Sequence, residues 1–286
     1  MKVCRFKQGS SNEVRVGLVA DDATVLDLTP AGINRLFPLL EGPEPVRQLE
    51  EAARGNLPRL ALAEVRLCAP VEQQEVWAAG VTYQRSKVAR IAESDFSATA
   101  YDRVYAADRP ELFFKSMPEK VVANAEPVGI RRDARWSVPE PELALVLNSR
   151  GGLVGCTIGN DMSSRDIEGE NLLYLPQAKT YDRSCALGPW ITLGVTEAAV
   201  RNWEIRLEIL RAGQPAFADS TSVAQIKRGF GELAGYLFRS QTFARGAVLL
   251  TGTGIVPPET FTLQAGDVVV IDITGIGRLR NTVAVV

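Results

Sequence analysis

The sequence predicts an α+β fold rich in β-structure, in which a folded-over mixed β-sheet dominates and helices are few. Short apolar runs of strand length follow one another from Pro110 onward, and Gly and Pro separate them as they do in turns. Helical periodicity interrupts these runs at residues 223–238. The predicted strands of this region are residues 110–115, 127–132, 141–147, 153–161, 189–195, 203–213, 246–255, 266–277 and 279–286.

Residues 1–66 are predicted to form a small N-terminal α+β domain in front of a larger domain, residues 67–286. Its predicted elements are strands at 14–20 and 24–29 and helices at 33–40 and 46–55. A further strand at 63–71 leads into the larger domain. Residues 83–107 are polar and weakly helical, which predicts a mobile surface element or lid.

The composition argues against several classes of partner. A formal net charge of -2 without a basic run argues against nucleic acid. No apolar stretch approaches the roughly 20 residues that span a bilayer, and the first residues do not form a signal peptide, so the predicted location is the cytoplasm. The four cysteines are scattered, which gives neither a zinc motif nor a case for a disulfide.

The sequence contains no histidine. Histidine is the side chain most often used as a general base near neutral pH, so its absence excludes Ser-His-Asp and Cys-His mechanisms. Proton transfer is left to Glu, Asp, Lys, Tyr or water.

Residues 138–147 carry two carboxylates, Glu140 and Glu142, in apolar surroundings. Alternate residues of a strand share a face, so both side chains point the same way and repel each other unless a cation joins them. A divalent ion with oxygen ligands is the simplest such cation. The alternative is a solvated edge strand in which Pro141 blocks further pairing.

A second acidic cluster begins with Asp161, just after the next apolar strand. With Glu140 and Glu142, Asp161 would give three oxygen ligands, enough to hold Mg²⁺ while water or substrate fills the other positions. Glu111, which opens the predicted strand at 110–115, is a candidate fourth ligand. The alternative is a set of solvated surface carboxylates.

Two other features are candidates for ligand binding. Lys179 lies between apolar and aromatic residues, where its pKa could be lowered or its ammonium could hold a substrate carboxylate. The alternative is a snorkelling lysine with a hydrated ammonium. Gly252 and Thr253 follow an apolar strand, and the glycines beside Thr253 let the backbone approach a ligand carboxylate; the alternative is an ordinary tight turn.

Ordered motifs from about Val76 to the last residue resemble the fumarylacetoacetate hydrolase superfamily. They are G-x-x-Y at 80–83, E-x-E at 140–142, G-N-D-x-S-x-R-D at 159–166, a lysine before G-P-W at 188–190, T-G-T at 251–253, G-D-V at 266–268 and G-I-G-x-L-x-N at 275–281.

The resemblance implies a mixed β-sheet roll of the fumarylacetoacetate hydrolase type, a homodimer or homotetramer, and Mg²⁺ as cofactor, with Mn²⁺ or Ca²⁺ as alternatives. It places the metal on Glu140, Glu142 and Asp161. It implies that Lys179 faces the substrate. The residues expected to bind substrate are Tyr83, Arg85, Gln177, Gly252 and Thr253.

One departure separates the chain from many hydrolases of the superfamily, which carry a His-Glu pair on the lid. The corresponding positions here are Ser86 and Ala89. The strings PELFFK, VPEPELALV, RDIEGEN and LPQAK are instead similar to the 2-keto-3-deoxy-D-arabinonate dehydratases of the superfamily. That similarity suggests Glu111 as an additional carboxylate at the metal, and Glu168 stands where the hydrolases tend to carry Gln.

The expected activity is therefore metal-dependent dehydration of a 2-keto-3-deoxy sugar acid. A metal ion chelated by a 2-oxo acid acidifies the adjacent methylene. Lys179 or Glu111 would remove that proton, and Glu168 would protonate the hydroxyl that leaves as water. Re-ketonisation would then yield a 2-oxo diacid semialdehyde. The alternatives are a C–C bond hydrolase, decarboxylase or isomerase of an acylpyruvate-like 2-oxo acid, and a non-catalytic ligand-binding protein on the same fold.

Overall fold

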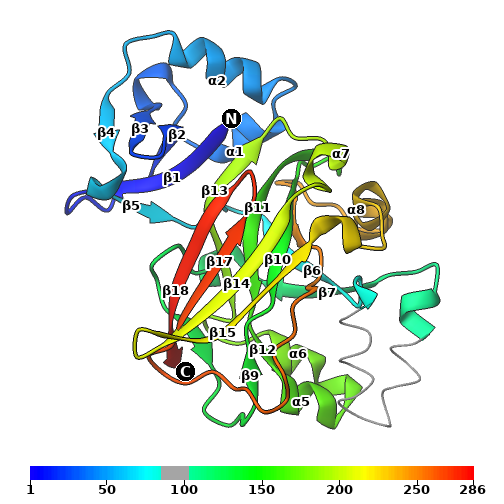
Figure 1. Cartoon of the computed structure of the whole chain (residues 1–286). Coiled ribbons are helices and arrows are strands. Elements are labelled where there is room, and N and C mark those ends of the chain that lie inside the picture. The colour runs from blue at the N-terminus through cyan, green and yellow to red at the C-terminus, as the bar shows by residue number, and fades with distance from the viewer. Residues whose placement is uncertain (85–102) are drawn as a thin grey trace.

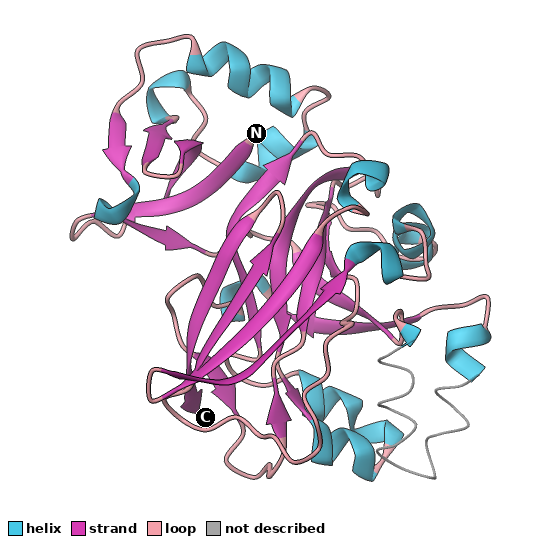
Figure 2. Ribbon diagram, in the orientation of Figure 1, coloured by secondary structure: helices cyan, strands magenta, loops and turns pink. Residues whose placement is uncertain are grey.

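The structure is a computed structural model that describes residues 1–84 and 103–286. Most of the predicted lid, including Arg85, Ser86 and Ala89, lies outside the described residues. Strands make up most of the regular structure (Figure 2). The fold is α+β and β-rich, as predicted.

Within the described residues, eleven strands form one sheet in the order β4-β3-β2-β1-β13-β11-β10-β16-β6-β7, with β5 paired to β1. Pairing is antiparallel except between β16 and β6, so the sheet is mixed. Its strands are β1 (Lys2–Gln8), β2 (Arg15–Asp21), β3 (Thr24–Asp27), β4 (Arg59–Ala61), β5 (Val65–Cys68), β6 (Glu75–Gly80), β7 (Glu111–Ser116), β10 (Pro141–Leu147), β11 (Leu153–Asp161), β13 (Cys185–Leu193) and β16 (Ala247–Leu250).

A second sheet lies in front of the first in the view of Figure 1. Its order is β15-β14-β17-β18-β8, and its strands are β8 (Val128–Ile130), β14 (Glu204–Arg211), β15 (Gln214–Ser222), β17 (Val268–Ile273) and β18 (Gly277–Val285). One buried cluster contains Leu145 and Ile158 from the first sheet and Leu207 and Ile271 from the second. The core therefore fills the space between the two sheets.

Short helices flank the sheets. They are α1 (Leu36–Glu41), α2 (Pro45–Ala53), α5 (Arg165–Glu170), α6 (Leu175–Lys179), α7 (Glu197–Val200) and α8 (Phe230–Phe238). A two-stranded sheet of β9 (Ser137–Val138) and β12 (Ser163–Ser164) lies beside α5 and α6 (Figure 1). None of the helices in the described ranges is long and apolar enough to cross a membrane.

The first residues of the chain are joined to the large sheet. Strand β1 pairs with β13, and Leu36 and Leu49 of the N-terminal helices share a buried cluster with Ile191 and Leu193 of β13. The strands of residues 1–66 thus belong to the same sheet as the strands that follow them in the chain. The division into domains 1–66 and 67–286 stays a prediction.

Most of the predicted elements are present with shifted ends, and one prediction was wrong in part. The helix expected at 223–238 is a 3-10 turn (Val223–Gln225) followed by α8, with Gly229 at the start of α8. Ser222 caps the 3-10 turn, and its hydroxyl accepts a hydrogen bond from the Ala224 amide. Such a local side-chain bond competes with a continuous helix.

Candidate active site

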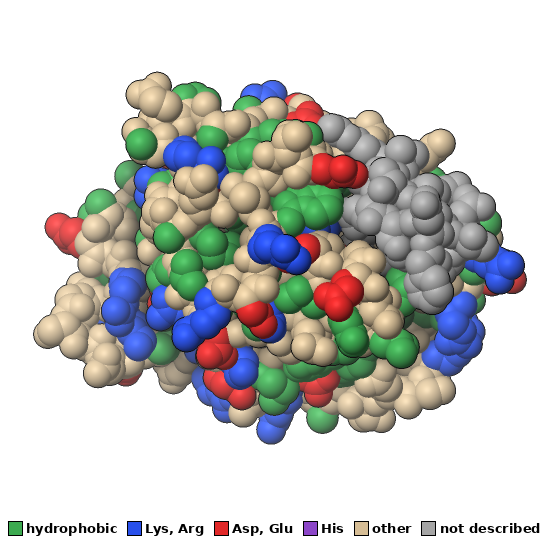
Figure 3. Space-filling model, turned by 90° about the horizontal axis from the view of Figure 1, so that it is seen from below, with side chains coloured by type: hydrophobic (Ala, Val, Ile, Leu, Met, Phe, Trp, Pro, Cys, Tyr) green, Lys and Arg blue, Asp and Glu red, His purple; other side chains and the backbone are tan. Residues whose placement is uncertain are grey.

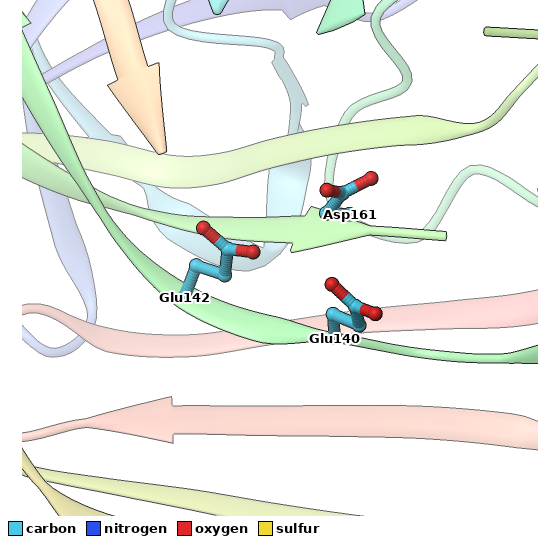
Figure 4. Close-up of side chains that lie close together, drawn as sticks. All are labelled: Glu140, Glu142 and Asp161. Carbon is cyan, nitrogen blue, oxygen red and sulfur yellow. The ribbon is translucent and has the colours of Figure 1, made fainter. Parts of the chain in front are cut away.

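Two neighbouring strands bring three carboxylates together. In the register of β10 and β11, Pro141 pairs with Asn160, so Glu140 and Asp161 flank this pair. Glu142 pairs with Gly159, where a Cβ would lie 2.1 Å from the Leu250 side chain. One oxygen from each of Glu140, Glu142 and Asp161 lies within 4.8 Å of the others (Figure 4). The three carboxylates therefore lie close together, as the alternation along one strand and the position of Asp161 at the end of the next strand predicted.

These carboxylates are buried. Glu140 is 4% exposed, and Glu142 and Asp161 are 1% exposed. Because β10 is hydrogen-bonded to strands on both sides, the alternative of a solvated edge strand is wrong. Burial raises the pKa of Glu142 well above its ordinary value, and the negative charges of Asp161 and Glu140 raise it further.

Cationic side chains surround the three carboxylates. The Lys179 ammonium lies 2.8 Å from Glu140 Oε2 and 3.2 Å from Asp161 Oδ2. Lys115 Nζ lies 2.5 Å from Asp161 Oδ1, and Arg165 lies 2.8 Å from Glu140 Oε1. Each carboxylate oxygen has two lone pairs, so these contacts leave acceptor capacity for an ion.

Lys179 ends helix α6 and is 1% exposed. Its ammonium also lies 2.6 Å from Ser163 Oγ and 5.7 Å from the centre of the Phe113 ring. The alternative of a snorkelling lysine is therefore wrong, because the charged end is the buried part. An amine among acceptors at the edge of a cavity can hold or transfer a proton there.

The loop after β16 completes the carboxylate site. The Gly252 amide donates a hydrogen bond to Glu142 Oε2 at 2.5 Å. Gly252 has φ +90°, and a Cβ there would lie 2.0 Å from Thr82 Oγ1, so another residue would need this loop to move. Thr253 is buried and its hydroxyl is within hydrogen-bond distance of the Ile255 backbone. The loop is more than a tight turn, because it orients Glu142.

A narrow cavity opens among these groups. Its walls are Ala79, Gly80, Val81, Phe113, Glu140, Glu142, Asp161, Arg165, Lys179, Gly252 and Thr253. The structure therefore brings together the three carboxylates, Lys179 and the Gly252–Thr253 loop.

Among the described residues, the other predicted site residues are not in the wall of this cavity. Glu111 is not in the carboxylate group; its side chain lies against Gly80, where a Cβ would meet Glu111 Oε2 at 2.0 Å. Glu168 is buried on α5, one turn beyond Arg165, and Tyr83 is buried against Gly254. Burial raises the pKa of Tyr83.

Gln177 is exposed, and its side chain is not in the cavity wall. Its substrate-binding role stays a prediction, as does that of Arg85 beyond the described residues.

Lys115 and Ser163 were not predicted. Lys115 lies on β7 where the pairing with β6 shifts register: Phe114 pairs with Trp77 and Ser116 pairs with Val76, which leaves Lys115 between them as the extra residue. Regular strand alternation could therefore not have placed its side chain beside Asp161. Ser163 is the serine of the G-N-D-x-S-x-R-D motif, and that motif is the sequence signal that points to it.

The chain belongs to the fumarylacetoacetate hydrolase family. The family model described as fumarylacetoacetate (FAA) hydrolase C-terminal matches residues 75–284. The fold and the ordered motifs agree with this membership.

Individual relatives are dehydratases by name. A probable 2-keto-3-deoxyxylonate dehydratase of Haloferax volcanii is 48% identical over 217 residues, which cover 76% of this chain and 74% of the relative. A 2-dehydro-3-deoxy-D-arabinonate dehydratase of Saccharolobus solfataricus is 36% identical over 274 residues, covering 93% of this chain and 91% of that protein.

A solved structure supports the same comparison. The 2-keto-3-deoxy-D-arabinonate dehydratase complexed with magnesium and 2,5-dioxopentanoate superposes with a TM-score of 0.83 at 32% sequence identity. The match covers 100% of this chain and 99% of that chain.

Proposed function

We propose that this protein is a divalent-metal-dependent dehydratase of a 2-keto-3-deoxy sugar acid of the 2-dehydro-3-deoxy-D-arabinonate type. The product would be 2,5-dioxopentanoate, the semialdehyde of a 2-oxo diacid. The observation that carries the proposal is the buried group of Glu140, Glu142 and Asp161 with the Lys179 amine beside it. The names and the ligands of the similar dehydratases support it.

The donor set fits a hard divalent cation. Carboxylate oxygens are the ligands that Mg²⁺ prefers, and Mn²⁺ and Ca²⁺ accept them as well. The pKa of Glu142 is raised first by its burial and then by the negative charges of Asp161 and Glu140 beside it. Glu140, Glu142 and Asp161 would hold Mg²⁺, with Glu111 as a further carboxylate. When bound, the ion supplies a Lewis acid that polarises the ketone of a 2-oxo acid and acidifies the neighbouring methylene.

The side chains around the cavity would move the protons. Lys179 Nζ takes a proton from C3 of the substrate; Glu111, beside Gly80, is the second candidate for this base. Glu168 gives a proton to the hydroxyl that leaves C4 as water. Since no histidine is present, these groups do the work that imidazole does in many enzymes.

Other residues would hold and shield the substrate. The Thr253 hydroxyl and the Gly252 loop lie in the cavity wall, where they can orient the substrate carboxylate. Phe113 covers the Lys179 amine and excludes water from it. Tyr83, Arg85 and Gln177 would contact the more distant part of the sugar acid.

The proposal extends to the surroundings of the enzyme. The chain would act in the cytoplasm as a homodimer or homotetramer on a small-molecule substrate, without nucleic acid or membrane. On the face seen from below, basic side chains lie among acidic ones rather than in one patch (Figure 3). Such a surface gives no electrostatic footprint for nucleic acid there.

Product analysis tests the proposed reaction. The protein is incubated with Mg²⁺ and 2-keto-3-deoxy-D-arabinonate, and the mixture is followed by proton NMR. Appearance of an aldehyde signal with loss of one water per substrate supports dehydration. Release of pyruvate would favour C–C cleavage and contradict it. An unchanged substrate that nevertheless binds would favour a non-catalytic ligand-binding protein.

A further inference from the structure

We infer that Ser163 is a positioning residue that aims the Lys179 amine at the reacting carbon. The inference rests on the proposed function, in which Lys179 takes the proton from C3. Ser163 lies on β12 and is 0% exposed, and its Oγ lies 2.6 Å from Lys179 Nζ. Neither the predicted site nor the names of the relatives give this serine a role.

The Ser163 hydroxyl can only accept from Lys179. It donates its single hydrogen to the Asp161 carbonyl oxygen at 2.9 Å. The lone pairs of the hydroxyl oxygen remain available, and they accept a hydrogen bond from the Lys179 ammonium. Because Ser163 accepts one N–H of Lys179, this bond fixes the orientation of the amine relative to the cavity.

The remaining close acceptors of Lys179 differ from Ser163 in kind. Glu140 Oε2 at 2.8 Å and Asp161 Oδ2 at 3.2 Å belong to the carboxylates proposed to hold the metal. A divalent ion would share those oxygens with the lysine. Ser163 is neutral and lies outside that set, so its bond to the amine does not depend on the ion.

The position of Ser163 is itself fixed by the fold. Its backbone pairs with Val138 of β9. The carbonyl of the preceding residue, Met162, accepts a hydrogen bond from Lys115 Nζ at 3.0 Å. A serine held on both sides by backbone contacts gives the flexible lysine side chain a rigid anchor.

Ser163→Ala tests this role, because it removes one oxygen and leaves the fold almost unchanged. We expect kcat to fall about 10- to 100-fold because the base is misaligned, while KM stays within about twofold. The dissociation constant of Mg²⁺, measured by calorimetry without substrate, should also stay within about twofold. Ser164→Ala is the matched control, since Ser164 is the next residue on β12, is buried, and points to the opposite face.

A kcat equal to that of the wild type would overturn the inference. So would a loss that appears in KM or in Mg²⁺ binding, or an equal loss in Ser164→Ala, because each indicates a structural effect.

A second reaction separates this inference from the proposed function. Exchange of the methyl protons of pyruvate with D₂O in the presence of Mg²⁺ reports proton removal from any 2-oxo acid. If the wild type exchanges these protons but does not dehydrate the sugar acid, the dehydratase proposal fails. The inference on Ser163 then holds if Ser163→Ala exchanges more slowly than Ser164→Ala, and it fails if the two rates are equal.

If the wild type does neither, crystal structures decide. The Lys179 amine should shift by about 1 Å or more in Ser163→Ala. An amine that keeps its place without the hydroxyl overturns the inference.

Discussion

At the scale of single residues, the sequence predicted the carboxylates but not what surrounds them. Alternation along one strand brought Glu140 and Glu142 together, and Asp161 followed from the next strand. Their burial could not be predicted, because it depends on which strands flank β10 in the sheet. The contact of Lys115 with Asp161 joins residues far apart in sequence, so no local pattern reveals it.

Glu142→Gln should remove turnover and yet stabilise the metal-free protein. The folded-state pKa of Glu142 lies above its ordinary value of 4.5, so above pH 4.5 the unfolded chain releases a proton that the folded protein still holds. In that window the stability of the metal-free wild type falls as pH rises. The variant lacks this dependence. Urea unfolding with a chelator from pH 4.5 to neutrality measures the difference.

The exposed Glu119→Gln is the control for this experiment and should follow the wild type. With Mg²⁺ present, turnover of Glu142→Gln should fall roughly 100-fold or more. A variant with wild-type turnover at limiting Mg²⁺ would remove Glu142 from the metal site.

Lys115→Met should destabilise the fold strongly. The buried ammonium contacts Asp161 and donates to the carbonyls of Met162 and Lys179, and methionine leaves these acceptors without it. Removing one partner of a buried ion pair costs about 3 kcal/mol of unfolding free energy, as urea unfolding would measure.

The matched control for Lys115 is Lys120→Met. Lys120 pairs with Asp182 at the surface, at 3.3 Å. That pair is solvated, so its loss should change the unfolding free energy by about 0.5 kcal/mol or less. Equal effects of the two substitutions would contradict the ion-pair role of Lys115.

At the scale of elements, the sequence predicted many of the apolar strands, but it did not predict the polar strand β15 or the short helices α5 and α6. Strand β15 is polar because it is an edge strand, with solvent along one side, and its sequence gave no alternation to detect. Helices α5 and α6 have six and five residues, too few to show a helical period. These two helices carry Glu168 and Lys179. The sequence therefore did not predict two of the elements that position residues of the site.

Gly252→Ala should disrupt the loop that orients Glu142. The added Cβ meets Thr82 Oγ1 and also lies 3.0 Å from the Ala79 carbonyl oxygen, and the backbone has φ +90°. We expect a loss of about 2–4 kcal/mol in unfolding free energy, together with weaker Mg²⁺ binding. Thermal unfolding and calorimetry measure the two effects.

Gly266→Ala is the control that separates the backbone strain of a positive φ from the steric crowding around the added Cβ. Gly266 has φ +88°, but a Cβ there meets no atom within 4 Å. This control should lose only about 1 kcal/mol. If Gly252→Ala and Gly266→Ala lost the same unfolding free energy, steric crowding would contribute nothing to the loss at Gly252.

At the scale of the whole molecule, one sheet links the N-terminal strands to the strands of the site. The sequence did not predict the order of strands in this sheet, because pairing between β1 and β13 joins segments at opposite ends of a long stretch of chain. The family motifs at 80–83, 140–142, 159–166 and 251–253 contribute residues to the cavity wall, which explains why the site was easier to predict than the sheet order.

Metal binding should stabilise the whole fold. A ligand that binds only the folded protein stabilises it by about 2.7 kcal/mol when present at about 100 times its Kd. Mg²⁺ should therefore raise Tm in a concentration-dependent manner, and a chelator should reverse the shift. Scanning calorimetry measures this, and Glu142→Gln should show little response. An equal Mg²⁺ response in that variant would point to a different binding site.

The most direct test of the account is a diffraction experiment on crystals grown with Mn²⁺ and an unreactive 2-oxo acid. We predict an anomalous manganese peak in contact with oxygens of Glu140, Glu142 and Asp161, with the 2-oxo acid bound beside it and facing Lys179. A peak elsewhere, or three carboxylates that keep only their contacts with Lys115, Arg165 and Lys179 at saturating metal, would contradict it.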